Sequence, residues 1–201
     1  MKIAVFVSGR GSNLNAILAY PDLKNYVEVV AVVSDKINCK AFDIARKYEI
    51  KIFTVGDGEG RIAQNNITSE LKNLEVKFIV LAGYLKLVPN DLIENFVDRI
   101  INIHPALLPS FGGKGMYGMN VHRAVFDSSA KVSGATVHIV DNTYDTGKII
   151  AQKCVDISDV KSPEEIAERV LKIEHQLLPE VIIAFAENRI KIESGRIIII
   201  D

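Results

Sequence analysis

Three features are scarce in this sequence: cysteine, an excess of charge of either sign, and long hydrophobic runs. Its 201 residues include two cysteines, Cys39 and Cys154, which form neither a disulfide framework nor a closely spaced metal pair. We expect both to lie buried as small hydrophobic residues in a reducing compartment. Lys and Arg number 24 and Asp and Glu 25, so the net charge of -1 predicts no general attraction to nucleic acid or to an anionic membrane.

The first hydrophobic run breaks at Gly9, which makes it too short for a secretory signal or a membrane span. We therefore expect a cytoplasmic protein. Hydrophobic residues make up 48% of the chain, enough for the core of one globular domain. No repeat, low-complexity tract or linker interrupts the sequence, so we expect a single domain over 1–201.

Short β-branched runs alternate with longer amphipathic stretches through the first half of the chain. This alternation is typical of βαβ units, and the nearly continuous apolar character of the runs is typical of parallel strands covered on both faces. The fold class predicted is α/β, with a doubly wound, mainly parallel sheet. The expected strands are 2–8, 28–34, 51–55, 77–83 and 99–104, and the expected helices lie near 12–20, 38–48, 60–74 and 89–96.

The second half has a different pattern. A glycine-rich loop and a helix precede two strands joined by seven residues, a connection too short for a crossover helix. Ser162, followed by Pro163 and two glutamates, predicts the start of a long helix that runs toward Asn188. The expected segments are the loop 112–118, the helix 119–128, the strands 133–140 and 148–155, and a terminal hairpin at 190–201 that turns at Ser194 and Gly195.

The segment Ser8-Gly9-Arg10-Gly11-Ser12-Asn13-Leu14 lies where the first strand passes into the first helix. Glycines allow a close backbone approach to an anion, and a helix N-terminus favours negative charge, so the segment predicts a phosphate site. It also resembles G-x-G-x-x-G, although Leu14 replaces the last glycine, and Asp35 could act as a ribose-binding acid. A glycine turn that only caps the helix remains an alternative.

Asn102 and His104 lie at the expected carboxyl end of the fifth strand, where open α/β sheets place their sites. Being two residues apart, they point to the same side of an extended strand. An amide and an imidazole aimed at one point suit an oxyanion intermediate, and Pro105 and Pro109 stiffen the exit from the strand. The alternative is that both side chains only satisfy loop backbone groups.

Asp145 lies in the turn 141–147, where its carboxylate could orient a histidine or accept a proton, although Asp is also an ordinary turn residue. We interpret His138, on the preceding strand, as a hydrogen-bonded structural residue. His122 and His175 lie in expected helices without a second ligand at metal spacing, so no metal is expected.

Five segments in this order, GRGSNLNAI, LAGYLKLVP, NIHPALLPSF, SGATVHIV and YDTGKIIAQ, resemble the motifs of the glycinamide ribonucleotide formyltransferase family. The resemblance extends from Met1 to about residue 190. It implies a Rossmann-like fold and transfer of a formyl group from 10-formyltetrahydrofolate, as co-substrate, to the amine of glycinamide ribonucleotide in purine biosynthesis. It implies a phosphate-binding half at 1–100 and a catalytic, folate-binding half at 101–190, acting as a monomer or homodimer.

The resemblance also assigns the site residues. The catalytic ones it implies are Asn102, His104 and Asp145. Those for the ribonucleotide are Gly11, Ser12, Asn13 and Glu174. Those for the folate are Arg61, Leu85, Lys86, Leu87, Val88, Asn102, Asp141, Asn142, Thr143, Tyr144 and Asp145.

The sequence departs from the family in its glycine-rich loop, which reads SFGGKGMYGMNVH where many members have a proline-glycine-leucine-histidine stretch. We expect this loop to be mobile and able to close over the substrate. Two other functions stay open: a formyltetrahydrofolate hydrolase with the same three catalytic residues, and a non-catalytic nucleotide-binding module that uses Asp35.

Overall fold

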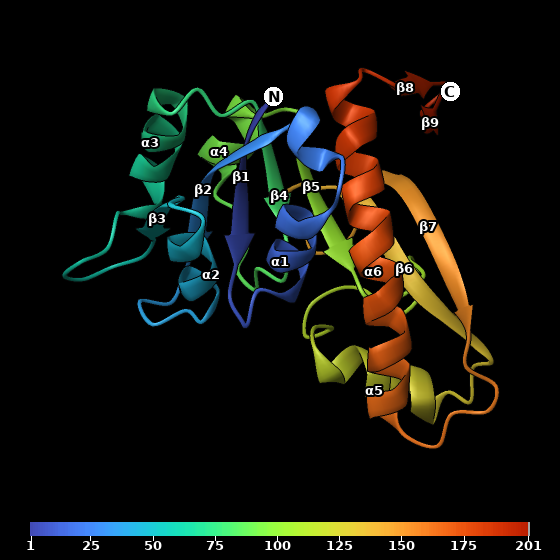
Figure 1. Ribbon diagram of the computed structural model, residues 1–201. Helices are drawn as coiled ribbons and strands as arrows, with labels where there is room; N and C mark the ends of the chain where they lie inside the picture. The colour runs from blue at the N-terminus through green and yellow to red at the C-terminus, as the bar shows by residue number, and fades with distance from the viewer. Residues whose placement is uncertain (201) are drawn as a thin grey trace. The chain divides into compact units, whose positions relative to one another are not determined.

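The computed structural model describes residues 1–200, apart from the side chain of residue 65. The chain divides into two compact units, Met1–Asn102 and Ile103–Asp201. Strands β1 to β7 belong to one sheet in the order β3-β2-β1-β4-β5-β6-β7 (Figure 1). The predicted α/β class with a mainly parallel sheet is therefore confirmed.

The first unit repeats strand and helix, as the sequence predicts. Its strands pair in parallel, β1 with β2 and β4, β2 with β3, and β4 with β5, and their central residues are almost completely buried. Its elements are β1 (Lys2–Val7), α1 (Ser12–Ala19), β2 (Glu28–Ser34), α2 (Ala41–Lys47), β3 (Lys51–Thr54), α3 (Ile67–Asn73), β4 (Phe78–Leu81), α4 (Asn90–Asn95) and β5 (Ile100–His104), with single 3-10 turns at Leu23–Asn25 and Gln64–Asn66.

The order of the strands creates a switch point between β1 and β4. From β1 the chain adds strands first on one side, β2 and β3, and then on the other, β4 and β5. Ligands of open α/β sheets bind at such a point, outside the carboxyl ends of the strands. The segments that leave those ends are 8–13 after β1 and 82–88 after β4, so the topology supports a ligand site there.

One expected helix is shorter than predicted. The helix expected near 60–74 begins only at Ile67, because Gly60 has a φ angle of 73° and Ala63 is extended, with a ψ angle of 140°. These angles lie outside the helical region. Ile62 instead pairs with Val55 in an isolated β-bridge.

The second unit is built around an antiparallel pair of strands. The long helix α6 packs against both of them, and its start is the predicted one, since the Ser162 side chain accepts a hydrogen bond from the N–H of Glu165 at 3.3 Å. Its elements are α5 (Met119–Asp127), β6 (Val132–Ile139), β7 (Ile149–Asp156), α6 (Pro163–Ala186), β8 (Ile190–Glu193) and β9 (Arg196–Ile199). Strands β8 and β9 form the predicted terminal hairpin.

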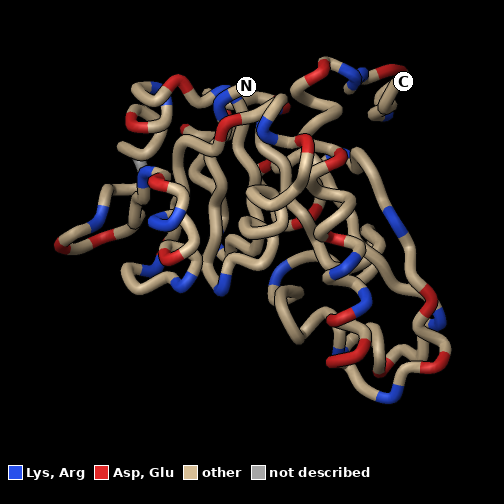
Figure 2. The backbone as a smooth tube through the Cα atoms, viewed as in Figure 1, with Lys and Arg blue, Asp and Glu red and all other residues tan. Residues whose placement is uncertain are grey.

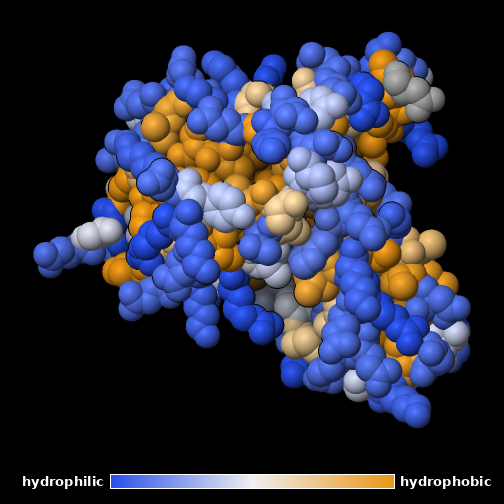
Figure 3. Space-filling model, in the orientation of Figure 1, coloured by the Kyte–Doolittle hydropathy of each residue, from blue (hydrophilic) through white to orange (hydrophobic). Residues whose placement is uncertain are grey.

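The surface agrees with the balanced composition. Lys and Arg alternate with Asp and Glu along both units (Figure 2). Hydrophobic residues reach the surface beside the terminal hairpin, where Ile192, Ile198 and Ile199 are exposed (Figure 3). Among residues 1–200, no helix combines the length and the apolar character that a membrane-spanning segment needs. Cys39 is buried as expected, whereas Cys154 is exposed, which corrects the expectation for that residue.

Candidate active site

A carboxylate between two imidazoles is the chemical centre of the second unit. Oδ2 of Asp145 lies 3.6 Å from Nδ1 of His104, and Oδ1 lies 3.6 Å from Nε2 of His138. The three side chains are buried or nearly so, at 11%, 4% and 3% exposed respectively. The structure therefore brings together two of the three predicted catalytic residues, His104 and Asp145, and adds His138 to them.

The outer nitrogens of both imidazoles contact backbone carbonyls. Nε2 of His104 lies 2.9 Å from the oxygen of Phe111, and Nδ1 of His138 lies 2.8 Å from the oxygen of Ile139. A carbonyl oxygen only accepts, so each of these two nitrogens donates a proton to its carbonyl partner.

The electrostatics of this cluster keep its members ready for proton transfer. Burial lowers the pKa of His104, and the opposing effects of Asp145 and of the Phe111 carbonyl do not reverse this. Burial would raise the pKa of Asp145, but the His138 hydrogen bond, the positive charge that His104 gains on protonation and the N–H of Gly113 together hold it below its ordinary value. At neutral pH the carboxylate is thus charged and His104 is neutral.

The turn that carries Asp145 is fixed by hydrogen bonds of its own. Asp141 accepts from the N–H of Thr143 at 3.0 Å and from the hydroxyl of Thr146 at 2.8 Å. The hydroxyls of Thr143 and Thr146 also contact each other. This network holds Asp145 at φ 59°, a left-handed conformation that Asp tolerates better than most residues. Asp141 and Thr143, which were predicted to bind folate, therefore have a clear role in shaping the turn.

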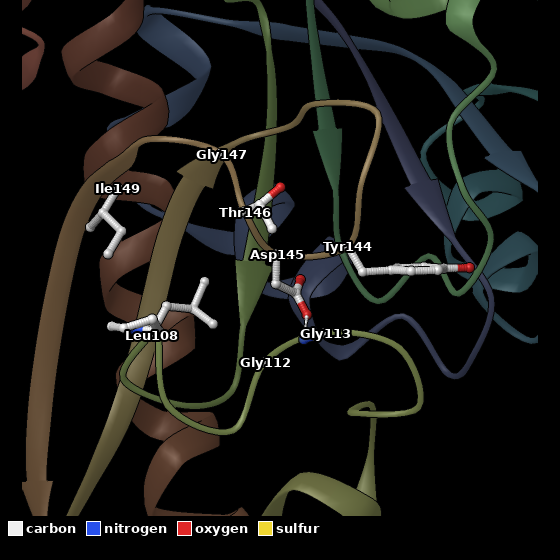
Figure 4. A pocket seen from close by; sticks show the side chains of 9 residues that line it. Leu108, Gly112, Gly113, Tyr144, Asp145, Thr146, Gly147 and Ile149 are labelled. Atoms are coloured by element: carbon white, nitrogen blue, oxygen red, sulfur yellow. Dashed lines mark hydrogen bonds between the residues drawn. The ribbon is translucent and has the colours of Figure 1, made fainter.

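A cavity of about 380 Å³ opens beside this turn. The Asp145 carboxylate points across it toward Gly113, whose N–H donates to Oδ2 at 2.8 Å (Figure 4). The lining combines apolar side chains with the Asp145 carboxylate, the hydroxyls of Tyr144 and Thr146 and glycine backbone, which suits a ligand with both apolar and polar parts. The lining residues are Leu108, Pro109, Gly112, Gly113, Tyr144, Asp145, Thr146, Gly147 and Ile149.

Asn102 is the third predicted catalytic residue. It lies on β5, two residues before His104, and is partly exposed, so both side chains leave the strand on the same side. The glycine-rich loop follows β5 closely in the sequence. The oxygen of Phe111 contacts His104, and the N–H of Gly113 donates to Asp145. A movement of this loop would therefore reach both residues.

The predicted phosphate loop lies in the first unit. Gly11 has φ 79°, and a Cβ there would lie 2.7 Å from Cβ of Ala41, so only glycine fits. It caps α1 without any side-chain hydrogen bond, and a helix N-terminus attracts an anion. Ser12 is exposed at this end, and Asn13 is 8% exposed.

The other predicted contacts divide between the two units. In the first, Nη1 of Arg61 donates to the carbonyl oxygens of Asp35 at 2.9 Å and Val55 at 3.4 Å. Leu85 and Leu87 expose 38% and 45% of their surface, and Lys86 is also exposed, whereas Val88 is buried. In the second, Glu174 is 7% exposed on α6, and Asn142 and Tyr144 are exposed in the turn.

A buried hydroxyl positions the segment between His104 and the cavity. Thr136 is fully buried on β6. Its Oγ1 donates to the oxygen of Ala106 at 2.6 Å and accepts from the N–H of Leu108 at 3.0 Å. Nε2 of Gln152, on β7, donates both to this hydroxyl at 3.0 Å and to the oxygen of Leu108 at 2.8 Å. Sequence reasoning missed both residues, because they meet only through the register that pairs Thr136 with Gln152.

Gln152→Glu is expected to destabilise the protein by about 0.5–1.5 kcal/mol, because Gln152 is exposed and the change replaces its N–H donor by a carboxylate oxygen that faces two acceptors. The melting temperature should fall by several degrees and kcat should fall with it. Gln176→Glu is the matched control, since Gln176 on α6 accepts from Nζ of Lys153 at 2.9 Å and a carboxylate accepts as well. Equal melting temperatures for the two variants would contradict this role of Gln152.

His122 predicts an acid-sensitive stability. It is 6% exposed on α5, its Nδ1 has no hydrogen-bond partner, and burial, aided by the nearby His104, lowers its pKa to about 4. Between pH 6.5 and pH 4 the His122 ring binds a proton in the unfolded chain but not in the folded one. The free energy of unfolding therefore decreases as the pH is lowered, by about 3 kcal/mol in total. His122→Gln should lose less stability than wild type between pH 7 and 4 in urea titrations. An unchanged pH dependence would contradict the burial of a neutral ring.

The described residues contain no group of three His, Cys, Asp or Glu side chains that could hold a metal ion. The acid proposed for a nucleotide-binding module, Asp35, directs its carboxylate to the hydroxyl of Ser8 at 2.6 Å. Leu14, at the last position of the glycine motif, is completely buried. Both residues are thus engaged within the fold.

Comparisons with known proteins show similarity along most of the chain. The family model described as formyl transferase matches residues 1–182. The chain is 44% identical over 195 residues to a chloroplastic phosphoribosylglycinamide formyltransferase of Arabidopsis thaliana, covering 94% of this chain and 67% of that protein. It is 38% identical to the phosphoribosylglycinamide formyltransferase of Bacillus subtilis (strain 168), covering 90% and 92%. The crystal structure of glycinamide ribonucleotide transformylase 1 from Symbiobacterium toebii matches with a TM-score of 0.89 at 33% identity, covering 100% and 94%. The chain thus spans about two thirds of the plant relative and nearly all of the bacterial ones.

Proposed function

Because the chain belongs to the formyl transferase family, we propose that it transfers the formyl group of 10-formyltetrahydrofolate to the amine of glycinamide ribonucleotide, a step of purine biosynthesis. The observation that carries the proposal is the Asp145 carboxylate held between two buried imidazoles beside a cavity. The relatives from Arabidopsis thaliana and Bacillus subtilis (strain 168) are phosphoribosylglycinamide formyltransferases. The reaction needs groups that move one proton and stabilise one oxyanion.

The chemistry follows from these groups. The substrate amine attacks the formyl carbon, and the carbonyl oxygen gains negative charge as the new C–N bond forms. The Asn102 amide donates a hydrogen bond to that oxygen. The amine proton passes to Nδ1 of His104 or to Asp145, which face each other at 3.6 Å, and then to N10 of the folate as the old C–N bond breaks.

Two segments of the first unit supply substrate contacts. The phosphate of the ribonucleotide binds the N–H groups at Gly11, Ser12 and Asn13, where α1 has no side-chain cap. In the same unit, the backbone of 85–88 and the side chain of Arg61 are the proposed folate contacts. In the second unit, the turn 141–145 is a proposed folate contact and Glu174 a proposed ribonucleotide contact. A cytoplasmic location, a single catalytic domain and a monomeric or homodimeric state stay predictions.

The test is formyl transfer from 10-formyltetrahydrofolate with and without glycinamide ribonucleotide, using wild type and His104→Ala. Folate product should appear only with the ribonucleotide and should fall at least about 100-fold in the variant. His175→Ala is the control, since His175 lies on α6 outside the cluster. Product without the ribonucleotide would instead show a hydrolase. No product in either case would overturn the proposal, and a thermal shift with NAD would then support a nucleotide-binding module.

A further inference from the structure

Ser8 is a buried hydroxyl at the point where the two ligand-binding segments of the first unit meet. It follows β1 directly and is 2% exposed. Its N–H donates to the oxygen of Gly83 at 2.9 Å, and its Oγ accepts from the N–H of Leu85 at 3.1 Å. Ser8 thus connects the start of the phosphate loop to the segment after β4.

Asp35 sets the direction of that hydroxyl. Oγ of Ser8 donates its single proton to Oδ1 of Asp35 at 2.6 Å, a short, charge-assisted hydrogen bond. With the proton fixed there, a lone pair of Oγ remains for the N–H of Leu85. The backbone oxygen of Asp35 accepts in turn from Nη1 of Arg61 at 2.9 Å. Asp35 therefore contacts Ser8 with its side chain and Arg61 with its backbone.

These contacts all lie at the carboxyl ends of neighbouring parallel strands. Val7 at the end of β1 is paired with Ser34 at the end of β2, and Phe6 is paired with Leu81 at the end of β4. The chain Arg61, Asp35, Ser8 and Leu85 therefore runs across the switch point of the sheet. It joins two of the residues proposed to bind folate, Arg61 and Leu85, to each other.

We propose that Ser8 and Asp35 are positioning residues for the folate, which hold the backbone of Leu85 and the guanidinium of Arg61 in the arrangement that binds it. This inference rests on the proposed function. The phosphate loop is anchored separately, since the oxygen of Gly9 accepts from the N–H of Ala41 at 3.2 Å and from Sγ of Cys39 at 3.3 Å. The pair therefore acts on the KM for folate more than on the KM for the ribonucleotide.

Three substitutions separate this role from simple stabilisation. Ser8→Ala and Asp35→Ala each remove the hydrogen bond, and each should raise the KM for 10-formyltetrahydrofolate about tenfold. Asp35→Asn keeps an oxygen that accepts from Ser8 and should stay within about twofold of wild type. In all three the KM for glycinamide ribonucleotide should change less than about twofold, and kcat should change little. The double variant Ser8→Ala/Asp35→Ala should resemble either single variant, because both remove the same interaction.

A matched control lies in the second unit. Oγ of Ser158 donates to Oδ1 of Asp156 at 2.6 Å, the same bond length between the same residue types, at an exposed turn. Ser158→Ala should leave both KM values unchanged.

The outcomes are distinct. If wild type transfers formyl and neither Ser8→Ala nor Asp35→Ala changes the folate KM, the positioning role is wrong. A rise of both KM values by the same factor would also overturn it, since that indicates general disorder. If wild type shows no formyl transfer, the proposed function fails instead. Should Ser8→Ala not fold, the comparison of Asp35→Ala with Asp35→Asn still decides the question.

Discussion

Asp145→Asn is expected to lower kcat by about 10²–10⁴-fold, the range in which general acid-base catalysis contributes to rates. The amide has nearly the same shape as the carboxylate and can still accept from the N–H of Gly113, so the turn should keep its structure. It cannot take up the proton that the substrate amine releases. Steady-state kinetics at saturating concentrations of both substrates measures the loss, and circular dichroism checks the fold.

The same variant makes a signed prediction for the pH profile. Burial already lowers the pKa of His104, so the kcat/KM of wild type should fall only below about pH 6.5, as this ring becomes protonated. The Asp145 carboxylate opposes that lowering, so its removal should shift the acid limb of the residual activity to a still lower pH. Asp156→Asn, an exposed carboxylate on β7, is the control and should change neither kcat nor the profile. A kcat within threefold of wild type for Asp145→Asn would remove this residue from proton transfer.

The parts of the fold that the sequence predicts well are those encoded locally. The β-branched runs of the first unit became parallel strands, and Ser162 with Pro163 marked the start of α6 to the residue. The helix expected near 60–74 was partly wrong, because Ile62 pairs with Val55 and Ala63 is extended, with a ψ angle of 140°, so the helix begins only at Ile67. The start of this helix depends on tertiary contacts such as the bridge between Val55 and Ile62, which the local sequence does not reveal.

The candidate site shows the same division. The resemblance to the formyltransferase family implied that His104 and Asp145 belong to one site, and the structure places their side chains 3.6 Å apart. The interpretation of His138 was incomplete. Its hydrogen bond to the oxygen of Ile139 is the expected structural contact, but its other nitrogen faces Asp145. Strand register determines which side chains come into contact, and a local sequence pattern does not predict the register.

The structure explains why a glycine, Gly147, follows Asp145 by two residues. A Cβ at this position would lie 1.8 Å from the oxygen of Ile139 and 2.8 Å from its carbonyl carbon. The two strands meet at this point, since the N–H of Ile139 donates to the oxygen of Lys148 at 2.9 Å. No side-chain rotation relieves a clash between backbone and Cβ, so an added methyl group must push the turn away from β6.

Gly147→Ala is therefore expected to destabilise the protein by about 3–5 kcal/mol and to lower its melting temperature by about 10 °C. Gly9→Ala is the stability control, because a Cβ there meets nothing within 4 Å. A melting temperature for Gly147→Ala within 2 °C of wild type would contradict the close approach of Gly147 to Ile139. Folded Gly147→Ala protein should also lose activity, since Asp145 lies on the displaced turn and its two 3.6 Å separations from His104 and His138 depend on where that turn sits. One glycine thus serves both the stability of the strand pair and the position of the carboxylate.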